Sequence, residues 1–102
     1  MQFTPDPTGF VCGEIAGAAS ATQLPDVVCR LVQVVAQKAN AGNVYLGGAG
    51  VTKPDGATDV TTGLELPPGI SSGWIPVPAG NLKAFYRICD NAGDDLTYLG
   101  LK

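Results

Sequence analysis

Alternation of apolar and polar positions is most regular in the last quarter of the chain. Over residues 82–89 every second side chain would point to the same face of a strand, a period of two that is typical of β-structure. A second apolar run follows at residues 96–101, after a loop rich in Asp, Asn and Gly. Two such runs joined by a polar loop predict a β-hairpin in which Leu82–Cys89 and Leu96–Leu101 pair antiparallel.

The middle of the chain contains three shorter β-rich runs, at residues 43–47, 63–66 and 73–77. They are separated by the turn sequences Pro54-Asp55-Gly56 and Pro67-Pro68-Gly69, in which proline fixes φ and glycine tolerates the positive φ that follows. Pro76 and Pro78 lack the N–H that a sheet ladder requires. We therefore expect the strand at 73–77 to lie at a sheet edge.

Residues 27–36 fit two different elements. Their apolar side chains can form one helical face, with Asp26 as an N-cap and Asn40 or Gly42 as a stop. Five of the nine residues from 27 to 35 are valine, however, and the stiffness of this side chain favours a pleated sheet. We interpret the segment as a long central strand covered on both faces, and a helix over residues 27–39 is the alternative.

The first 26 residues are rich in Pro, Gly, Ala, Ser and Thr, and residues 10–15 are expected to form a short strand. Small side chains bury little area, so we predict an extended N-terminal arm over residues 1–26 and a sandwich domain over residues 27–102. The large apolar side chains of the arm are the candidate partner contacts: Phe3, Phe10, Val11 and Ile15. A frayed terminus is the alternative interpretation.

Short strands about ten residues apart, with Pro/Gly turns between them, indicate an all-β fold. We expect a small antiparallel β-sandwich or jelly-roll-like domain. The length of 102 residues allows one such domain with one core.

Composition narrows the possible partners. Only 15% of the residues are charged, where about 25% is typical, which favours a protein with much of its surface covered by partners. The net charge is −3 and the six cations are scattered, so we expect no direct contact with nucleic acid. No run reaches the roughly 20 apolar residues of a membrane span. Residues 1–7 lack the pattern of a signal peptide, which predicts assembly in the cytoplasm.

The residues that usually carry catalysis are scarce. The chain has no histidine, so we expect no catalytic residue, no metal site and no cofactor, and hence no enzyme. The loop carboxylates Asp90, Asp94 and Asp95 do not have the spacing of a calcium loop. Three cysteines without a CxxC motif predict reduced thiols, buried as small hydrophobic residues. Trp74 and the tyrosines are candidates for a sugar-stacking platform.

Three motifs in order resemble a group of small tailed-bacteriophage virion proteins. They are Asn43-Val44-Tyr45-Leu46-Gly47-Gly48, which Val51-Thr52 follows, then Gly63-Leu64-Glu65-Leu66-Pro67-Pro68-Gly69, then Leu82-Lys83-Ala84-Phe85-Tyr86-Arg87-Ile88. The similarity covers about residues 27–101 and implies a β-sandwich structural component of the particle, several of which coat capsids as cement proteins.

From the resemblance we expect a capsid decoration protein in the virion that bridges and stabilises major capsid subunits. A homo-oligomer is expected, with a trimer favoured. A head–tail connector, a tail or fibre component, and a small host-surface or carbohydrate-binding module are the alternatives.

Overall fold

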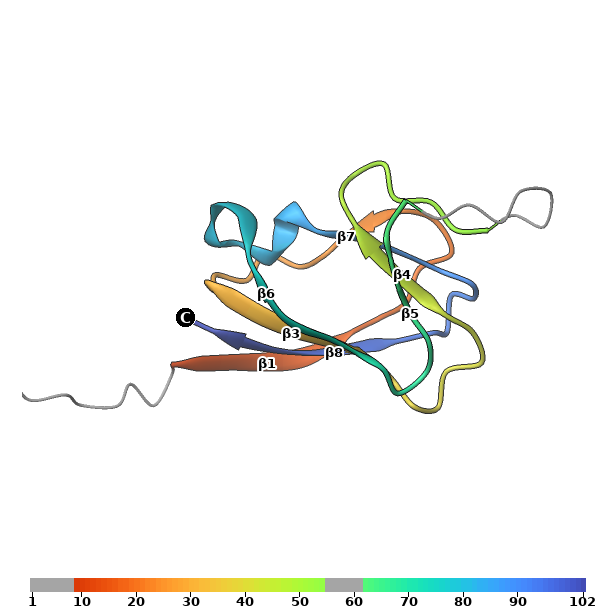
Figure 1. Ribbon diagram of the computed structural model, residues 1–102, viewed down its shortest axis with the longest axis horizontal. Coiled ribbons are helices and arrows are strands. Elements are labelled where there is room, and N and C mark those ends of the chain that lie inside the picture. The colour runs from red at the N-terminus through yellow and green to blue at the C-terminus, as the bar shows by residue number, and fades with distance from the viewer. Residues whose placement is uncertain (1–8, 55–61) are drawn as a thin grey trace, which may run out of the picture.

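A computed structural model of the chain describes residues 9–54 and 62–102 (Figure 1). These residues form two four-stranded antiparallel sheets that pack face to face around one hydrophobic core. The predicted all-β sandwich is therefore confirmed. One sheet has the strand order β1–β8–β3–β6 and the other the order β2–β7–β4–β5. The bounds are β1 Phe10–Ile15, β2 Thr22–Gln23, β3 Leu31–Ala36, β4 Val44–Gly47, β5 Leu64–Leu66, β6 Ser71–Pro76, β7 Tyr86–Cys89 and β8 Leu96–Leu101.

Strand β3 runs through the middle of its sheet, between β8 and β6. Its side chains alternate between half-buried and fully buried, and Val32, Val34 and Ala36 point into the core. The strand interpretation of the valine-rich segment is confirmed over residues 31–36. Two parts of it are wrong: residues 27–30 precede the strand, and only one face of β3 is fully buried.

The predicted hairpin between residues 82–89 and 96–101 is wrong. Strand β7 pairs with β4 and β2 in one sheet, whereas β8 pairs with β1 and β3 in the other. Residues Leu82–Ala84 form a short 3-10 helix, η2, rather than strand. Alternation shows only that a strand buries one face, and β7 and β8 bury theirs on opposite sides of the same core. The loop over residues 90–95 crosses between the sheets.

The predicted arm is also corrected over its described part. Strand β1 pairs with β8 along all six of its residues, and β2 pairs with β7. Ile15 and Leu24 are core residues. Residues 9–26 are thus built into the sandwich, and no boundary falls at residue 26; Phe3 lies outside the described residues.

The small residues of this segment permit close packing rather than an arm. A Cβ on Gly13 would lie 3.1 Å from the ring of Tyr98, the residue opposite it on β8. A Cβ on Gly17 would lie 2.2 Å from the backbone oxygen of Asp94. Glycine is required at position 17 because the two chain segments approach each other too closely for a side chain.

Two local predictions from proline and glycine are confirmed. Strand β6, which contains Pro76, lies at the edge of its sheet. In the turn at residues 67–70, the N–H of Ile70 donates to the oxygen of Pro67 at 3.0 Å, and Gly69 has a φ of 81°. Those values fit a type II turn. The other predicted turn, Pro54-Asp55-Gly56, falls largely on residues 55–61, outside the described residues.

Candidate interaction surface

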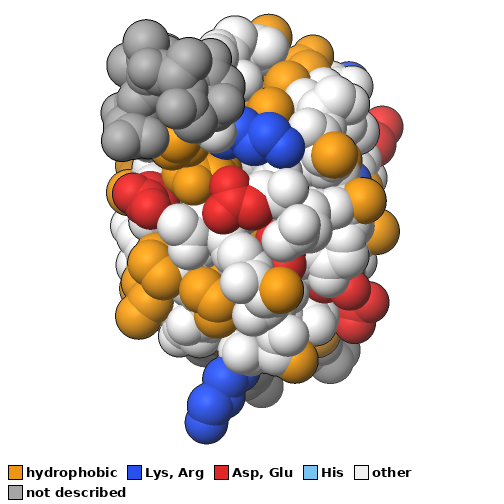
Figure 2. All heavy atoms as spheres, turned by 90° about the vertical axis from the view of Figure 1, so that its right-hand side faces the viewer, with side chains coloured by type: hydrophobic (Ala, Val, Ile, Leu, Met, Phe, Trp, Pro, Cys, Tyr) orange, Lys and Arg blue, Asp and Glu red, His pale blue; other side chains and the backbone are white. Residues whose placement is uncertain are grey.

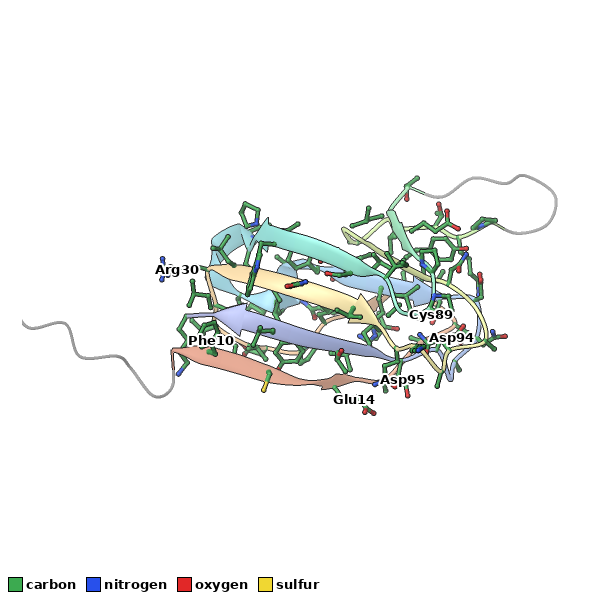
Figure 3. All side chains as sticks on the ribbon, turned by 60° about the horizontal axis from the view of Figure 1, so that its bottom comes forward. Phe10, Glu14, Arg30, Cys89, Asp94 and Asp95 are labelled. Atoms are coloured by element: carbon green, nitrogen blue, oxygen red, sulfur yellow. The ribbon has the colours of Figure 1, made fainter. Side chains whose placement is uncertain are left out.

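The strand register places the outward side chains of the β1–β8–β3–β6 sheet in three rows across the strands. We call this surface the outer face, and Figure 3 shows its four strands side by side. Each row runs across the strands in the order β1, β8, β3, β6. The rows are Phe10–Leu101–Leu31–Pro76, Cys12–Leu99–Gln33–Trp74 and Glu14–Thr97–Val35–Ser71.

The outer face is mainly apolar and open to solvent. Phe10 is 60% exposed, Trp74 50% and Leu99 39%, and Leu31, Val35 and Leu101 are half-buried. Glu14 is the one charged residue in the three rows. A solvated face of an antiparallel sheet normally carries polar side chains. The outer face instead has the composition of a surface that another molecule covers.

Charged groups lie at the two ends of the outer face. Glu14 and Asp95 are at one end, and Arg30 is at the end where Phe10 begins β1 (Figure 3). The Arg30 guanidinium donates to the backbone oxygen of Lys102 at 2.8 Å. An apolar centre with polar groups at its margin is the usual anatomy of a protein interface.

A bulge in β6 places Trp74 on this face. The register of β6 against β3 shifts between Gln33 and Val35, at Gly73, whose φ is 71°. The hydroxyl of Ser72 accepts the N–H of Val34 at 2.9 Å, and the amide of Gln33 donates to the hydroxyl of Ser71 at 2.7 Å. These bonds replace the ladder bonds that the bulge removes and hold the strand end in place.

The outer side of the other sheet is covered by the protein's own chain over β4, whereas Tyr86 and Ile88 of β7 are half-buried and Glu65 of β5 is exposed. Side chains alternate along β4, so Tyr45 points outward, away from the core that Val44 and Leu46 enter. Tyr45 is nevertheless only 2% exposed. Val51 is buried over the same surface. Gly47 has the same outward parity as Tyr45, and a Cβ on Gly47 would lie 3.1 Å from a methyl group of Val51. The ammonium group of Lys53 donates to the backbone oxygen of Cys89 at 2.8 Å.

The loop between β7 and β8 is organised by a buried carboxylate. Asp94 is 1% exposed, and one of its oxygens accepts the N–H groups of Ala41 and Gly42 at 3.0 and 3.1 Å. The other oxygen accepts the N–H and the side-chain amide of Asn91 at 2.9 and 3.0 Å. Burial raises the pKa of Asp94, but these hydrogen bonds outweigh it, so the pKa is lowered overall.

The other loop carboxylates also bind parts of the protein itself. Asp90 accepts the N–H of Asn43 at 2.9 Å and the hydroxyl of Tyr45 at 3.2 Å, and Asp95 accepts the N–H of Gly17 at 2.9 Å. Figure 2 views this end of the molecule, where acidic side chains lie among apolar and polar ones. Among residues 9–54 and 62–102, no group of three His, Cys, Asp or Glu side chains is arranged to hold a metal ion. The carboxylates of this loop therefore have structural partners.

Arg87 is buried and holds the crossing between β1 and β2. Its guanidinium donates to the backbone oxygen of Ala16 at 2.9 Å and to that of Gln23 at 2.7 Å. Burial lowers the pKa of Arg87, and the nearby Cys89 opposes this shift. The side chain stabilises the segment that sequence reasoning assigned to an arm.

The three cysteines differ in environment. Cys29 and Cys89 are core residues, as expected of small hydrophobic side chains, and burial raises the pKa of both thiols. A raised pKa reduces the thiolate fraction that a nucleophile needs. Cys12 is exposed on the outer face.

The structure separates the three predicted contact residues that it describes, Phe10, Val11 and Ile15, and Phe3 lies outside the described residues. Phe10 lies on the outer face, whereas Ile15 is buried in the core and Val11 packs against it from the inner side of β1. Ile15 and Val11 are thus corrected from partner contacts to residues of the inner side. Sequence reasoning missed Leu99, Leu31 and the bulk of the outer face. The available signal was a run of apolar residues at both odd and even positions of one strand, as in residues 31–36.

A surface hollow lies beside the short 3-10 helices Pro78–Gly80 and Leu82–Ala84. Its lining residues are Gln23, Pro78, Ala79, Asn81, Lys83 and Ala84. The amide of Gln23 donates to the backbone oxygen of Lys83 at 2.7 Å, and the oxygen of Asn81 accepts the N–H groups of Val27 and Lys83. The polar side chains of Gln23 and Asn81 are therefore bonded to the protein's own backbone.

Comparison of the chain with protein-family models, with curated proteins and with solved structures finds no match. Within residues 9–54 and 62–102, no helix has the length and apolar character to cross a membrane.

Proposed function

We propose that this chain is a non-enzymatic structural protein that binds another protein through the outer face of the β1–β8–β3–β6 sheet. The observation that carries the proposal is the set of exposed apolar side chains on that face, above all Phe10, Leu99 and Trp74. Fully burying one such side chain is worth roughly 1.5–3 kcal/mol, so three of them supply much of the free energy of a stable complex. The sandwich presents them on a rigid surface, which limits the entropy lost on binding.

The chemistry of the face favours a protein partner over a carbohydrate. Trp74 lies beside apolar neighbours, and the amide of Gln33, next to it in the same row, is already bonded to Ser71. A sugar ring stacked on Trp74 would find few groups nearby to bind its hydroxyls. A glycan that binds the wild type and not the Trp74→Ala variant would favour the carbohydrate-binding alternative.

The particular function that we propose is capsid decoration in a tailed-bacteriophage virion. The support is the order of the three motifs at residues 43–48, 63–69 and 82–88 that resemble small virion proteins. The partner would be the major capsid protein, and the protein would be homo-oligomeric, as the resemblance implies. Repetition over a symmetric shell multiplies a modest contact into a large gain in particle stability.

A matched pair of variants tests the docking surface. Leu99→Ser removes an apolar side chain from the outer face, whereas Leu64→Ser removes one of comparable exposure, 47% against 39%, from β5 of the other sheet. We expect only Leu99→Ser to reduce the occupancy of this chain on particles made from the genome that encodes it. Equal occupancy for both variants would contradict the proposed surface.

Copy number tests the place in the particle. A decoration protein is present in hundreds of copies per virion, and a connector or tail component in roughly a dozen or fewer. Quantifying the chain in purified particles decides between them. Complete absence from particles would contradict the virion proposal but would leave the docking surface to be tested with other partners.

A further inference from the structure

The free edges of the two sheets are unequal. Strands β2 and β5, at the edges of one sheet, have two and three residues. At one edge of the other sheet, β6 is interrupted by the bulge at Gly73 and contains Pro76. Short strands, bulges and prolines are the usual features that prevent an edge from pairing with another chain. Strand β1, at the remaining edge, has none of them.

Strand β1 is six residues long, contains no proline and pairs with β8 in one continuous register. The N–H of Lys102 donates to the oxygen of Gly9, which fixes the phase of this ladder. Because backbone groups alternate in direction along a strand, the N–H and C=O groups of Phe10, Cys12 and Glu14 face away from β8. Among residues 9–54 and 62–102, no hydrogen-bond partner is present for these outward groups.

We propose that two copies of this protein associate by antiparallel pairing of β1 with β1 about a two-fold axis at Cys12. In this arrangement Phe10 of each copy lies opposite Glu14 of the other, and the two Cys12 residues face each other. Every outward N–H and C=O of one strand then meets its counterpart on the other. The proposal concerns the edge of the sheet and does not depend on what the outer face binds.

The side chains of β1 suit this register. On the inner side, Val11 of one copy lies opposite Gly13 of the other, a large residue against a small one. The same combination exists inside the molecule, where Val11 pairs with Gly100 on β8. Glu14, the only charged residue of β1, would be separated from its equivalent by four residues of strand, about 14 Å. No like charges meet across the pairing, so the edge is complementary to itself.

The pairing also joins the outer faces. An antiparallel β1–β1 contact makes one continuous eight-stranded sheet from two four-stranded ones. Phe10, which lies at the margin of a single copy, would lie in the middle of the combined surface, beside Glu14 of the other copy. This two-fold arrangement takes the place of the trimer that the sequence resemblance implies.

Charge substitutions test the register through self-association, measured by sedimentation velocity on the full chain. Phe10→Glu places a carboxylate opposite Glu14 of the other copy twice per dimer, and we expect the dimer dissociation constant to rise roughly tenfold. Glu14→Lys alone should change it little. The double variant Phe10→Glu/Glu14→Lys should restore the dimer, because opposite charges then face each other. Leu99→Ser, on the outer face, should leave the dimer intact.

Cys12 provides an independent test. Residues that form a hydrogen-bonded pair have Cα atoms about 5.5 Å apart, which lies within the range of a disulfide. Mild oxidation with copper–phenanthroline should therefore link wild-type dimers, and the Cys12→Ser variant should dimerise without becoming linked. A monomer at all soluble concentrations, a trimer, or a dimer that neither the charge variants nor Cys12 oxidation affects would overturn the proposal.

Discussion

The two sheets of this sandwich have the same number of strands, but their outer surfaces differ in how far the protein's own chain covers them. Over β4, the outer side of the β2–β7–β4–β5 sheet is covered by the protein's own chain, and Tyr45 and Val51 are buried there. The outer face of the β1–β8–β3–β6 sheet has apolar residues of similar size, and Phe10 and Trp74 are at least half exposed. Apolar area that one sheet buries within the chain is left uncovered on the other.

The comparison shows that an apolar outward residue has two possible roles in a small sandwich. On the covered side it contributes to folding, because its area is removed from water within the chain. On the open side it contributes little to folding and is available to a partner, whose binding would then stabilise the folded state by mass action. Substitutions should therefore divide into those that change stability and those that change binding.

The largest loss of stability is expected at Asp94, which fixes the loop joining the two sheets. Asp94→Asn replaces one acceptor oxygen with an NH₂ group that faces donors, and we expect a loss of about 2–3 kcal/mol at neutral pH. Chemical denaturation measures this loss, with Asp26→Asn as the exposed control. An unchanged free energy of unfolding would contradict the structural role of this carboxylate.

The same residue predicts a pH dependence. The pKa of Asp94 is lower in the folded state than its ordinary value of 3.8, so its charge stabilises the fold above that pH. The stabilisation is lost as the pH falls through the folded-state pKa. We expect the wild type to lose more stability between pH 5 and pH 2 than the Asp94→Asn variant does, roughly the window in which such carboxylates titrate. Parallel curves for the two proteins would contradict the assignment.

A smaller loss is expected on the covered side. Val51→Ala removes two methyl groups from a buried position, and we expect a loss of about 1–2 kcal/mol. On the open side, Trp74→Ser should cost less than about 1 kcal/mol, because half of the side chain is already in water. Thermal or chemical unfolding of both variants measures the difference. If Trp74→Ser were the more destabilising of the two, the distinction between the faces would fail.

The smallest effect is expected from modification of Cys12. This thiol lies on the open face, whereas Cys29 and Cys89 are in the core. A maleimide should label the native protein at Cys12 alone with little change in stability, and should label all three cysteines after unfolding. Mass spectrometry counts the labels. Rapid labelling of Cys89 in the native state would show that the core near the 90–95 loop opens readily.

Much of the local structure could be predicted from the sequence. Valine stiffness predicted a strand over residues 27–36, of which residues 31–36 form β3, and the missing N–H of Pro76 predicted an edge strand. The turn at residues 67–70 follows from the conformational limits of Pro68 and Gly69. Each of these properties belongs to a residue and its immediate neighbours, so no knowledge of the rest of the fold is needed.

Only the tertiary structure decided which strands pair and which face stays open. The alternation in β7 and β8 is the same whether they form a hairpin or lie in opposite sheets, because it reports burial of one face and not the identity of the neighbour. The crossing between them depends on the bonds of Asp94 to Ala41 and Gly42, some 50 residues away in the chain. The same holds for residues 9–26, where Gly13 of β1 fits against the ring of Tyr98 and Gly17 fits against the 90–95 loop. Contacts between distant segments are set by the packing of the whole chain, so a local sequence pattern cannot identify them.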